Sequence, residues 1–156
     1  IAFKALSMIG LIPIWVILFF IFQPDFSGVT LVNILISIPN MALAFFVGYL
    51  LSSAITALAF WTTRVYSIHE FYFALILLFS GQFVPLPLMP KLVQDVAQYL
   101  PFQLFIYYPV QLILGKLSTE QIIQGYLLAG VWLVISLALF NWVWREGVKR
   151  FSAVGA

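Results

Sequence analysis

Residues 81–90 read GQFVPLPLMP and put three prolines at the end of a long apolar run. The run begins at Phe71, after the polar pair His69 and Glu70. Proline lacks a backbone N–H and its ring clashes with the preceding turn, so a regular helix is not expected to continue past Pro85. About 14 residues of helix, or roughly 21 Å, would precede that proline, which is less than the ~30 Å of a bilayer core. Another segment must therefore complete any crossing that starts here.

The composition is typical of an integral membrane protein. Of the 156 residues, 64% are hydrophobic and 8% are charged, whereas soluble domains carry about 25% charged residues. Apolar segments recur up to the C-terminus, so a cleaved signal peptide does not explain them. The chain begins with Ile1 and enters a long apolar segment at once, so we expect a fragment of a longer protein.

Several kinds of chemistry are not expected. The chain has no cysteine, which removes disulfides, thiolate metal sites and cysteine nucleophiles. The net charge of +2 is too small to indicate nucleic-acid binding, and no GxxxxGK[ST] motif is present for ATP. The three carboxylates that the predicted topology places on the outer side are too scattered for a metal site or paired-carboxylate catalysis. We therefore predict no catalytic residues, no metal and no cofactor; those carboxylates are Asp25, Asp95 and Glu120.

The uncharged runs predict an all-α integral membrane protein with one transmembrane domain over residues 1–156. About four helices would cross the bilayer, and a re-entrant helical hairpin would lie in the outer leaflet between the last two. Val29 to Ile38 is interpreted as an interfacial lead-in to the second span. The predicted spans are 5–22, 39–60, 70–84 and 122–144, with the hairpin at 85–115 and a polar tail at 145–156.

The hairpin prediction depends on two short pieces. KLVQDVAQYL, residues 91–100, has one apolar face and suits a short helix in the outer interface. Pro101 can open a second helix, but Pro109 is expected to interrupt it. Neither piece can cross a bilayer, and irregular backbone at membrane depth must be covered by protein or water. An apolar extracellular loop is the alternative.

The basic residues predict the orientation. With four crossings, both ends of the chain lie on one side of the membrane. That side carries most of the basic residues and is predicted to be cytoplasmic in the plasma membrane. It receives Lys4, Arg64, Arg145, Lys149 and Arg150, whereas the outer side receives Lys91 and Lys116.

Four motifs in order resemble those of the permease subunits of type-2 ATP-binding-cassette exporters. They are LAFWT at 58–62, SGxxxPLxxxP at 80–90, PFxxxxYxPVQxxLGKLS at 101–118 and KRFSAVGA at 149–156. The chain is most similar to the branch with uncharacterised substrates whose chains end in a similar Ser-Ala-Val-Gly tail. The resemblance implies spans three to six of a six-helix permease, with a re-entrant pair of short helices before the last span. The first two spans and the main cytoplasmic coupling helix would be missing from this sequence.

Three groups of residues are candidates for function. A stripe of small and polar side chains at every fourth position could pack helices together or line a pathway. A polar loop could contact an ATPase subunit or anchor the interface, and a group around the prolines could form an outer gate. The stripe is Asn40, Ala44, Gly48, Ser52 and Thr56; the loop group is Arg64, His69 and Glu70; the outer group is Gly81, Pro85, Pro87, Pro90, Pro101, Phe102 and Pro109.

The leading hypothesis is a non-enzymatic permease subunit of an ATP-driven exporter. Its partners would be a separate ATP-binding cassette subunit, a second permease copy or paralogue, and membrane lipid, without nucleic acid. A membrane scaffold or assembly protein is one alternative, since the small-residue stripe would serve it equally well. A lipid-modifying membrane enzyme is another, but it needs a polar catalytic constellation at membrane depth, which the sequence does not show.

Overall fold

A computed structural model describes the backbone of residues 2–154 and the side chains of residues 10–150. The predictions that involve Lys4, Gly155 and Ala156 therefore fall outside the described side chains. This part of the chain is helical and contains no strand, which confirms the all-α prediction. The longer helices are α1 (Ala2–Phe22), α2 (Leu31–Ala57), α3 (Val65–Phe79) and α6 (Thr119–Val154). The short ones are η1 (Leu58–Phe60), η2 (Leu86–Leu88), α4 (Lys91–Ala97), η3 (Pro101–Leu104) and α5 (Tyr107–Ile113).

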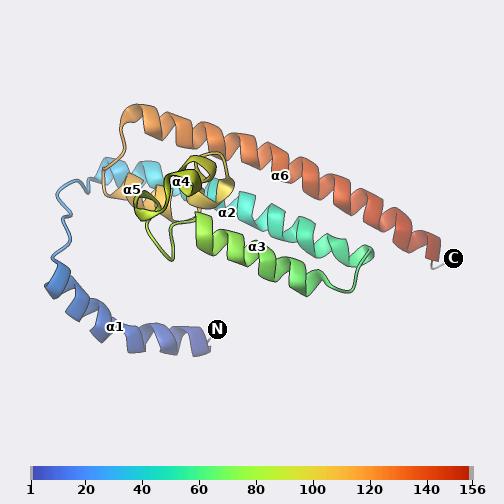
Figure 1. Cartoon of the computed structure of the whole chain (residues 1–156), viewed down its shortest axis with the longest axis horizontal. Helices are drawn as coiled ribbons and strands as arrows, with labels where there is room; N and C mark the ends of the chain where they lie inside the picture. The colour runs from blue at the N-terminus through green and yellow to red at the C-terminus, as the bar shows by residue number, and fades with distance from the viewer. Residues whose placement is uncertain (1, 155–156) are drawn as a thin grey trace.

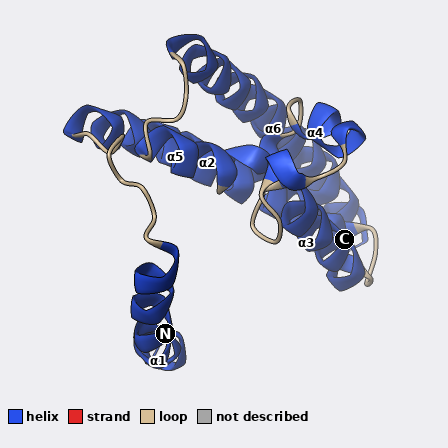
Figure 2. Cartoon of the chain, turned by 60° about the vertical axis from the view of Figure 1, so that its left-hand side comes forward, coloured by secondary structure: helices blue, strands red, loops and turns tan. Residues whose placement is uncertain are grey.

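The body of the structure is built on α2 and α6, which lie side by side and form the most extensive helix contact. α3 runs beside the C-terminal part of α2 only (Figure 1). α4 and α5 come after α3 in the chain and lie toward the N-terminal part of α2. α1 stands apart from this body in both views (Figures 1 and 2). By length and apolar composition, Leu31–Phe60 and Thr119–Arg150 could each cross a membrane. The apolar stretches Gly10–Phe22 and Val65–Phe79 are shorter, so the four crossings stay a prediction.

The helix that contains the second predicted span begins before residue 39. Thr30 caps α2, because its hydroxyl oxygen accepts the backbone N–H of Asn33 at 3.2 Å. The helix then continues through Pro39 to Ala57 without a break. The expected interfacial lead-in and the expected span therefore form one helix.

α6 begins with a capping box. The Ser118 hydroxyl accepts the backbone N–H of Gln121 at 3.3 Å, and the Gln121 side-chain oxygen accepts the backbone N–H of Ser118 at 2.9 Å. From this start the helix runs for 36 residues, about 54 Å. It continues through Arg145 to Val154, so the expected polar tail is helical over its described part. A helix of this length exceeds the ~30 Å of a bilayer core.

α3 ends at Phe79 instead of near residue 84 because the backbone turns before the first proline. Gly81 has φ +76°, a left-handed conformation that side chains with a Cβ rarely adopt. The Ser80 hydroxyl accepts the backbone N–H of Gln82 at 3.2 Å, and the Ser80 carbonyl accepts that of Tyr107 at 3.0 Å. The serine and the glycine thus end the helix, and the prolines shape the segment that follows.

Pro109 lies in the first turn of a helix instead of interrupting one. It is the third residue of α5, where a missing N–H costs nothing because the first N–H groups of a helix have no partner within it. α5 then ends in a Schellman motif: the Gly115 N–H donates to the Leu112 carbonyl at 3.1 Å, and the Lys116 N–H donates to the Gln111 carbonyl at 3.0 Å. Gly115 has φ +66°, as this motif requires.

The segment between α3 and α6, where the hairpin was predicted, packs against both α2 and α6. Leu104 and Leu112 are fully buried there, beside Ala44 of α2 and Ala129 of α6. Tyr108 belongs to the same cluster, and its hydroxyl donates to the Ile122 carbonyl at 2.8 Å. Small side chains on the two long helices let the hairpin pack closely, which stabilises helix association where lipid is as apolar as the side chains.

The contact of Tyr108 with α6 gives a test of the fold. A Cβ at Gly125 would lie 2.0 Å from Cζ of Tyr108, whereas a Cβ at Gly130 meets nothing within 4 Å. Gly125→Ala is expected to lower the free energy of unfolding by about 1–3 kcal/mol through overpacking. Gly130→Ala on the same helix is the control and should be neutral or slightly stabilising. Thermal unfolding in detergent measures both, and equal midpoints would contradict this packing.

Candidate functional site

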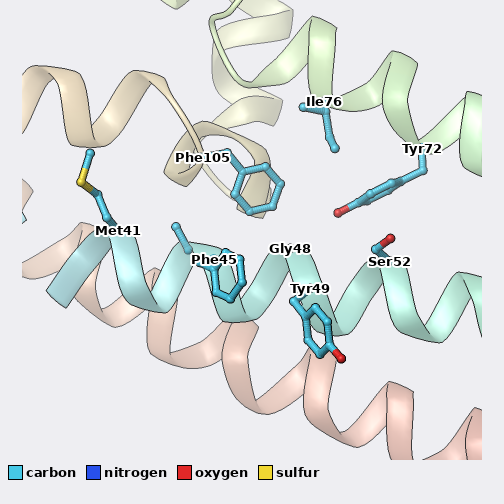
Figure 3. A pocket seen from close by; sticks show the side chains of 9 residues that line it. Met41, Phe45, Gly48, Tyr49, Ser52, Tyr72, Ile76 and Phe105 are labelled. Atoms are coloured by element: carbon cyan, nitrogen blue, oxygen red, sulfur yellow. The ribbon is translucent and has the colours of Figure 1, made fainter. Parts of the chain in front are cut away.

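A groove of about 610 Å³ opens between α2, α3 and the hairpin. Its α2 wall includes Ala44, Gly48 and Ser52, and Phe105 closes it from the hairpin side (Figure 3). Tyr72 of α3 stands opposite Ser52 with its hydroxyl directed into the space between the helices (Figure 3). The lining contains no ionisable carboxylate or amine, so the groove suits an apolar or amphipathic occupant.

The stripe on α2 is brought onto one side of the helix but does not share one environment. Asn40 and Ala44 are buried, whereas Gly48 and Ser52 are partly exposed. A Cβ at Gly48 would lie 3.5 Å from Phe105, an ordinary van der Waals contact. Helix α3 and the hairpin therefore pack closely against the small residues of the stripe. The part of the stripe that they leave uncovered forms the groove wall.

Two polar groups near the groove are buried without a hydrogen-bond partner among the described residues. They are both amide atoms of Asn40 and the hydroxyl of Tyr72. Buried polar atoms of this kind are uncommon because leaving one unpaired costs about 1–3 kcal/mol. Of the two residues, only Tyr72 lines the groove, so its hydroxyl keeps unused hydrogen-bonding capacity beside an apolar surface.

The loop group separates in the structure. His69 lies on α3 and its Nε2 is 3.1 Å from Oγ1 of Thr56, the last residue of the stripe. Because the Thr56 hydroxyl donates to the Ser52 carbonyl at 2.9 Å, it accepts from Nε2–H of His69. Arg64 and Glu70 stay exposed. No sequence pattern indicated the Thr56–His69 pair, since the two residues lie on different helices.

The outer group surrounds an aromatic cluster centred on Phe102. This ring is buried and stacks on Phe79 of α3, with centroids 6.2 Å apart and an interplanar angle of 20°. It also contacts Tyr72 at 5.9 Å and Phe105 at 6.1 Å. Pro101 is fully buried beside it, while Pro85, Pro87 and Pro90 are exposed. Phe102 and Gly81 thus join α3 to the hairpin, and the three exposed prolines lie on the connecting loop.

The described side chains bring together no catalytic or metal-binding arrangement. No group of three His, Asp or Glu residues gathers within this part of the chain. The Thr56–His69 pair is not arranged for nucleophile activation, because the hydroxyl proton already points to a backbone carbonyl.

Comparison with known proteins identifies the class. Residues 1–155 match the family model described as ABC-2 family transporter protein. The chain therefore belongs to the ABC-2 transporter family, a family of multi-pass membrane proteins, and the predicted resemblance is confirmed. Comparisons with curated proteins and with solved structures gave no match.

The corner at Gly81 gives a test of how the hairpin is attached. A Cβ there would lie 3.0 Å from Cβ of Tyr107, and the left-handed backbone adds a cost of its own. Gly81→Ala is expected to destabilise the protein by about 1–2 kcal/mol. The neighbouring exposed Gln82→Ala should have little effect. Thermal unfolding in detergent distinguishes them, and an unchanged midpoint for Gly81→Ala would contradict the tight corner.

Proposed function

We propose that the chain is the membrane-embedded permease part of an ATP-driven exporter. The observation that carries the proposal is the family match, which covers residues 1–155. ATP hydrolysis would occur on a separate subunit, since the sequence has no phosphate-binding loop. A second permease copy or a paralogue would complete the pathway in the plasma membrane, with both ends of this segment cytoplasmic.

The groove supports a role in cargo passage. It is apolar, is bordered by the small-residue stripe and adjoins the corner where α3 meets the hairpin. Cargo that enters such a surface leaves water or lipid for a wall without charges, so lipophilic and amphipathic compounds fit it best. The aromatic cluster of Phe102, Phe79 and Tyr72 would then form the outer boundary of this route.

Blocking the groove tests this role. Gly48→Trp places a large ring in the space beside Phe105, whereas Ala42→Trp puts the same ring on an exposed position of α2 outside the groove lining. The full-length protein is co-expressed with its ATPase subunit, and uptake of a lipophilic fluorescent dye panel is followed in inside-out vesicles. Gly48→Trp is expected to reduce ATP-dependent uptake to near background, and Ala42→Trp to retain it. Failure of the wild type to co-purify with an ATPase subunit and to transport would refute the exporter.

The orientation has a separate test, which the cysteine-free sequence makes simple. Asp95→Cys lies on α4 and Thr63→Cys lies in the loop before α3, and both positions are exposed. A membrane-impermeant maleimide added to intact cells is expected to label residue 95 and to leave residue 63 unlabelled until the cells are opened. The reverse pattern would overturn the predicted topology.

A further inference from the structure

A second recess, of about 640 Å³, lies on another side of the hairpin, against the first half of α6. We call it the glutamine recess after Gln98, Gln103, Gln121 and Gln124, which line it together with Tyr99 and Tyr107. The Trp132 indole N–H donates to the Tyr99 carbonyl at 2.9 Å and fixes the end of the α4 region to α6. The recess is thus held between two parts of the structure that are bonded to each other.

The glutamine side chains keep unused donors and acceptors. The Gln103 amide N–H donates to the Gln98 carbonyl at 3.1 Å, which leaves its side-chain oxygen available. The Gln121 oxygen is occupied by the α6 cap, which leaves its amide N–H groups. Gln124 donates to Glu120 at 3.3 Å and retains its oxygen. The side chains that line the recess therefore retain both acceptor and donor groups.

The recess has no ionised side chain in its lining. The Glu120 carboxylate lies outside this lining and accepts from Gln124, so a charged ligand would lose hydration here without an opposite charge in the lining itself, which is costly. The lining also includes the rings of Tyr99 and Tyr107 and the apolar side chains of Leu128 and Val131. A suitable ligand is therefore uncharged, with donor and acceptor groups on its edges and apolar C–H surfaces on its faces.

We propose that the glutamine recess binds a glycosyl unit. A pyranose ring carries hydroxyl groups that both donate and accept on its edges and C–H groups on its faces, so it matches the amides and the tyrosine rings at once. The volume lies within the range of about 300–1,000 Å³ typical of small-molecule sites. The unit could belong to a glycolipid headgroup or to a free oligosaccharide, which share this chemistry. The proposal does not depend on transport.

The test uses the full-length protein in phosphatidylcholine nanodiscs prepared without sugar-based detergents. One arm contains diglucosyldiacylglycerol in the nanodisc, and the other adds free maltose. Binding to the folded protein is expected to raise the thermal midpoint in a concentration-dependent way in at least one arm. A response to the glycolipid alone assigns the lipid-linked source, and a response to both assigns the glycosyl unit itself.

Matched variants connect the response to the recess. Gln98→Leu and Gln124→Leu are each expected to weaken glycosyl binding about tenfold through the loss of one hydrogen bond. Gln82→Leu, outside the recess, should leave it unchanged. Val131→Trp blocks the recess from an exposed position without changing any amide, which keeps the test valid if a glutamine variant unfolds.

Three results would overturn the proposal. The first is the absence of a thermal response in both arms. The second is an unchanged response in Gln98→Leu, Gln124→Leu and Val131→Trp. The third is an equal or stronger response to phosphatidylglycerol or to a neutral dipeptide than to either glucoside. None of these results bears on the exporter proposal, because no arm involves ATP or transport.

Discussion

The need to satisfy backbone hydrogen bonds governs the region between α3 and α6. In lipid an unpaired N–H or C=O costs several kcal/mol. A helix can therefore end at membrane depth only if other protein groups hydrogen-bond to the backbone groups that its end leaves unpaired. At the end of α3 the buried Ser80 does this twice, through its hydroxyl and through its carbonyl. The second bond reaches the first residue of α5, so the end of one helix and the start of another are fixed together.

That bond helps to hold the short helices against α2 and α6. Once Tyr107 is fixed next to Ser80, the hairpin turns inward and buries Leu104 and Leu112 against the small residues of the long helices. The same packing separates two surfaces of different character. The groove on the α3 side is apolar, while the recess on the α6 side presents amides and tyrosines.

Much of the architecture could be predicted because lipid imposes simple length and polarity rules. Composition and uncharged run lengths predicted an all-α fold and identified where the third helix would be short. Helix boundaries were harder, because they depend on local bonds. A proline pattern placed the end of α3 near residue 84, but Ser80 and Gly81 end it first. Pro109 looked like an interruption because its position within the first turn of α5 was not evident.

The site residues could likewise be predicted only in part from the sequence. The four-residue spacing of the stripe is visible in the sequence, and the structure brings its central members to one groove. The Thr56–His69 bond and the glutamine recess join residues from different helices, so no spacing rule could show them. The capping box at Ser118 and Gln121 was present as a sequence signal and would have placed the start of α6 correctly.

The uninterrupted length of α6 sets it apart mechanically. α1 and α2 contain Pro13 and Pro39, which remove a backbone hydrogen bond and favour bending. α6 has no proline in its 36 residues. It carries the recess near its first turns and Arg145, Lys149 and Arg150 near its last. Without a proline, every residue of α6 can keep its backbone N–H in the helix ladder, so one continuous helix joins the charged end to the end that packs against the hairpin.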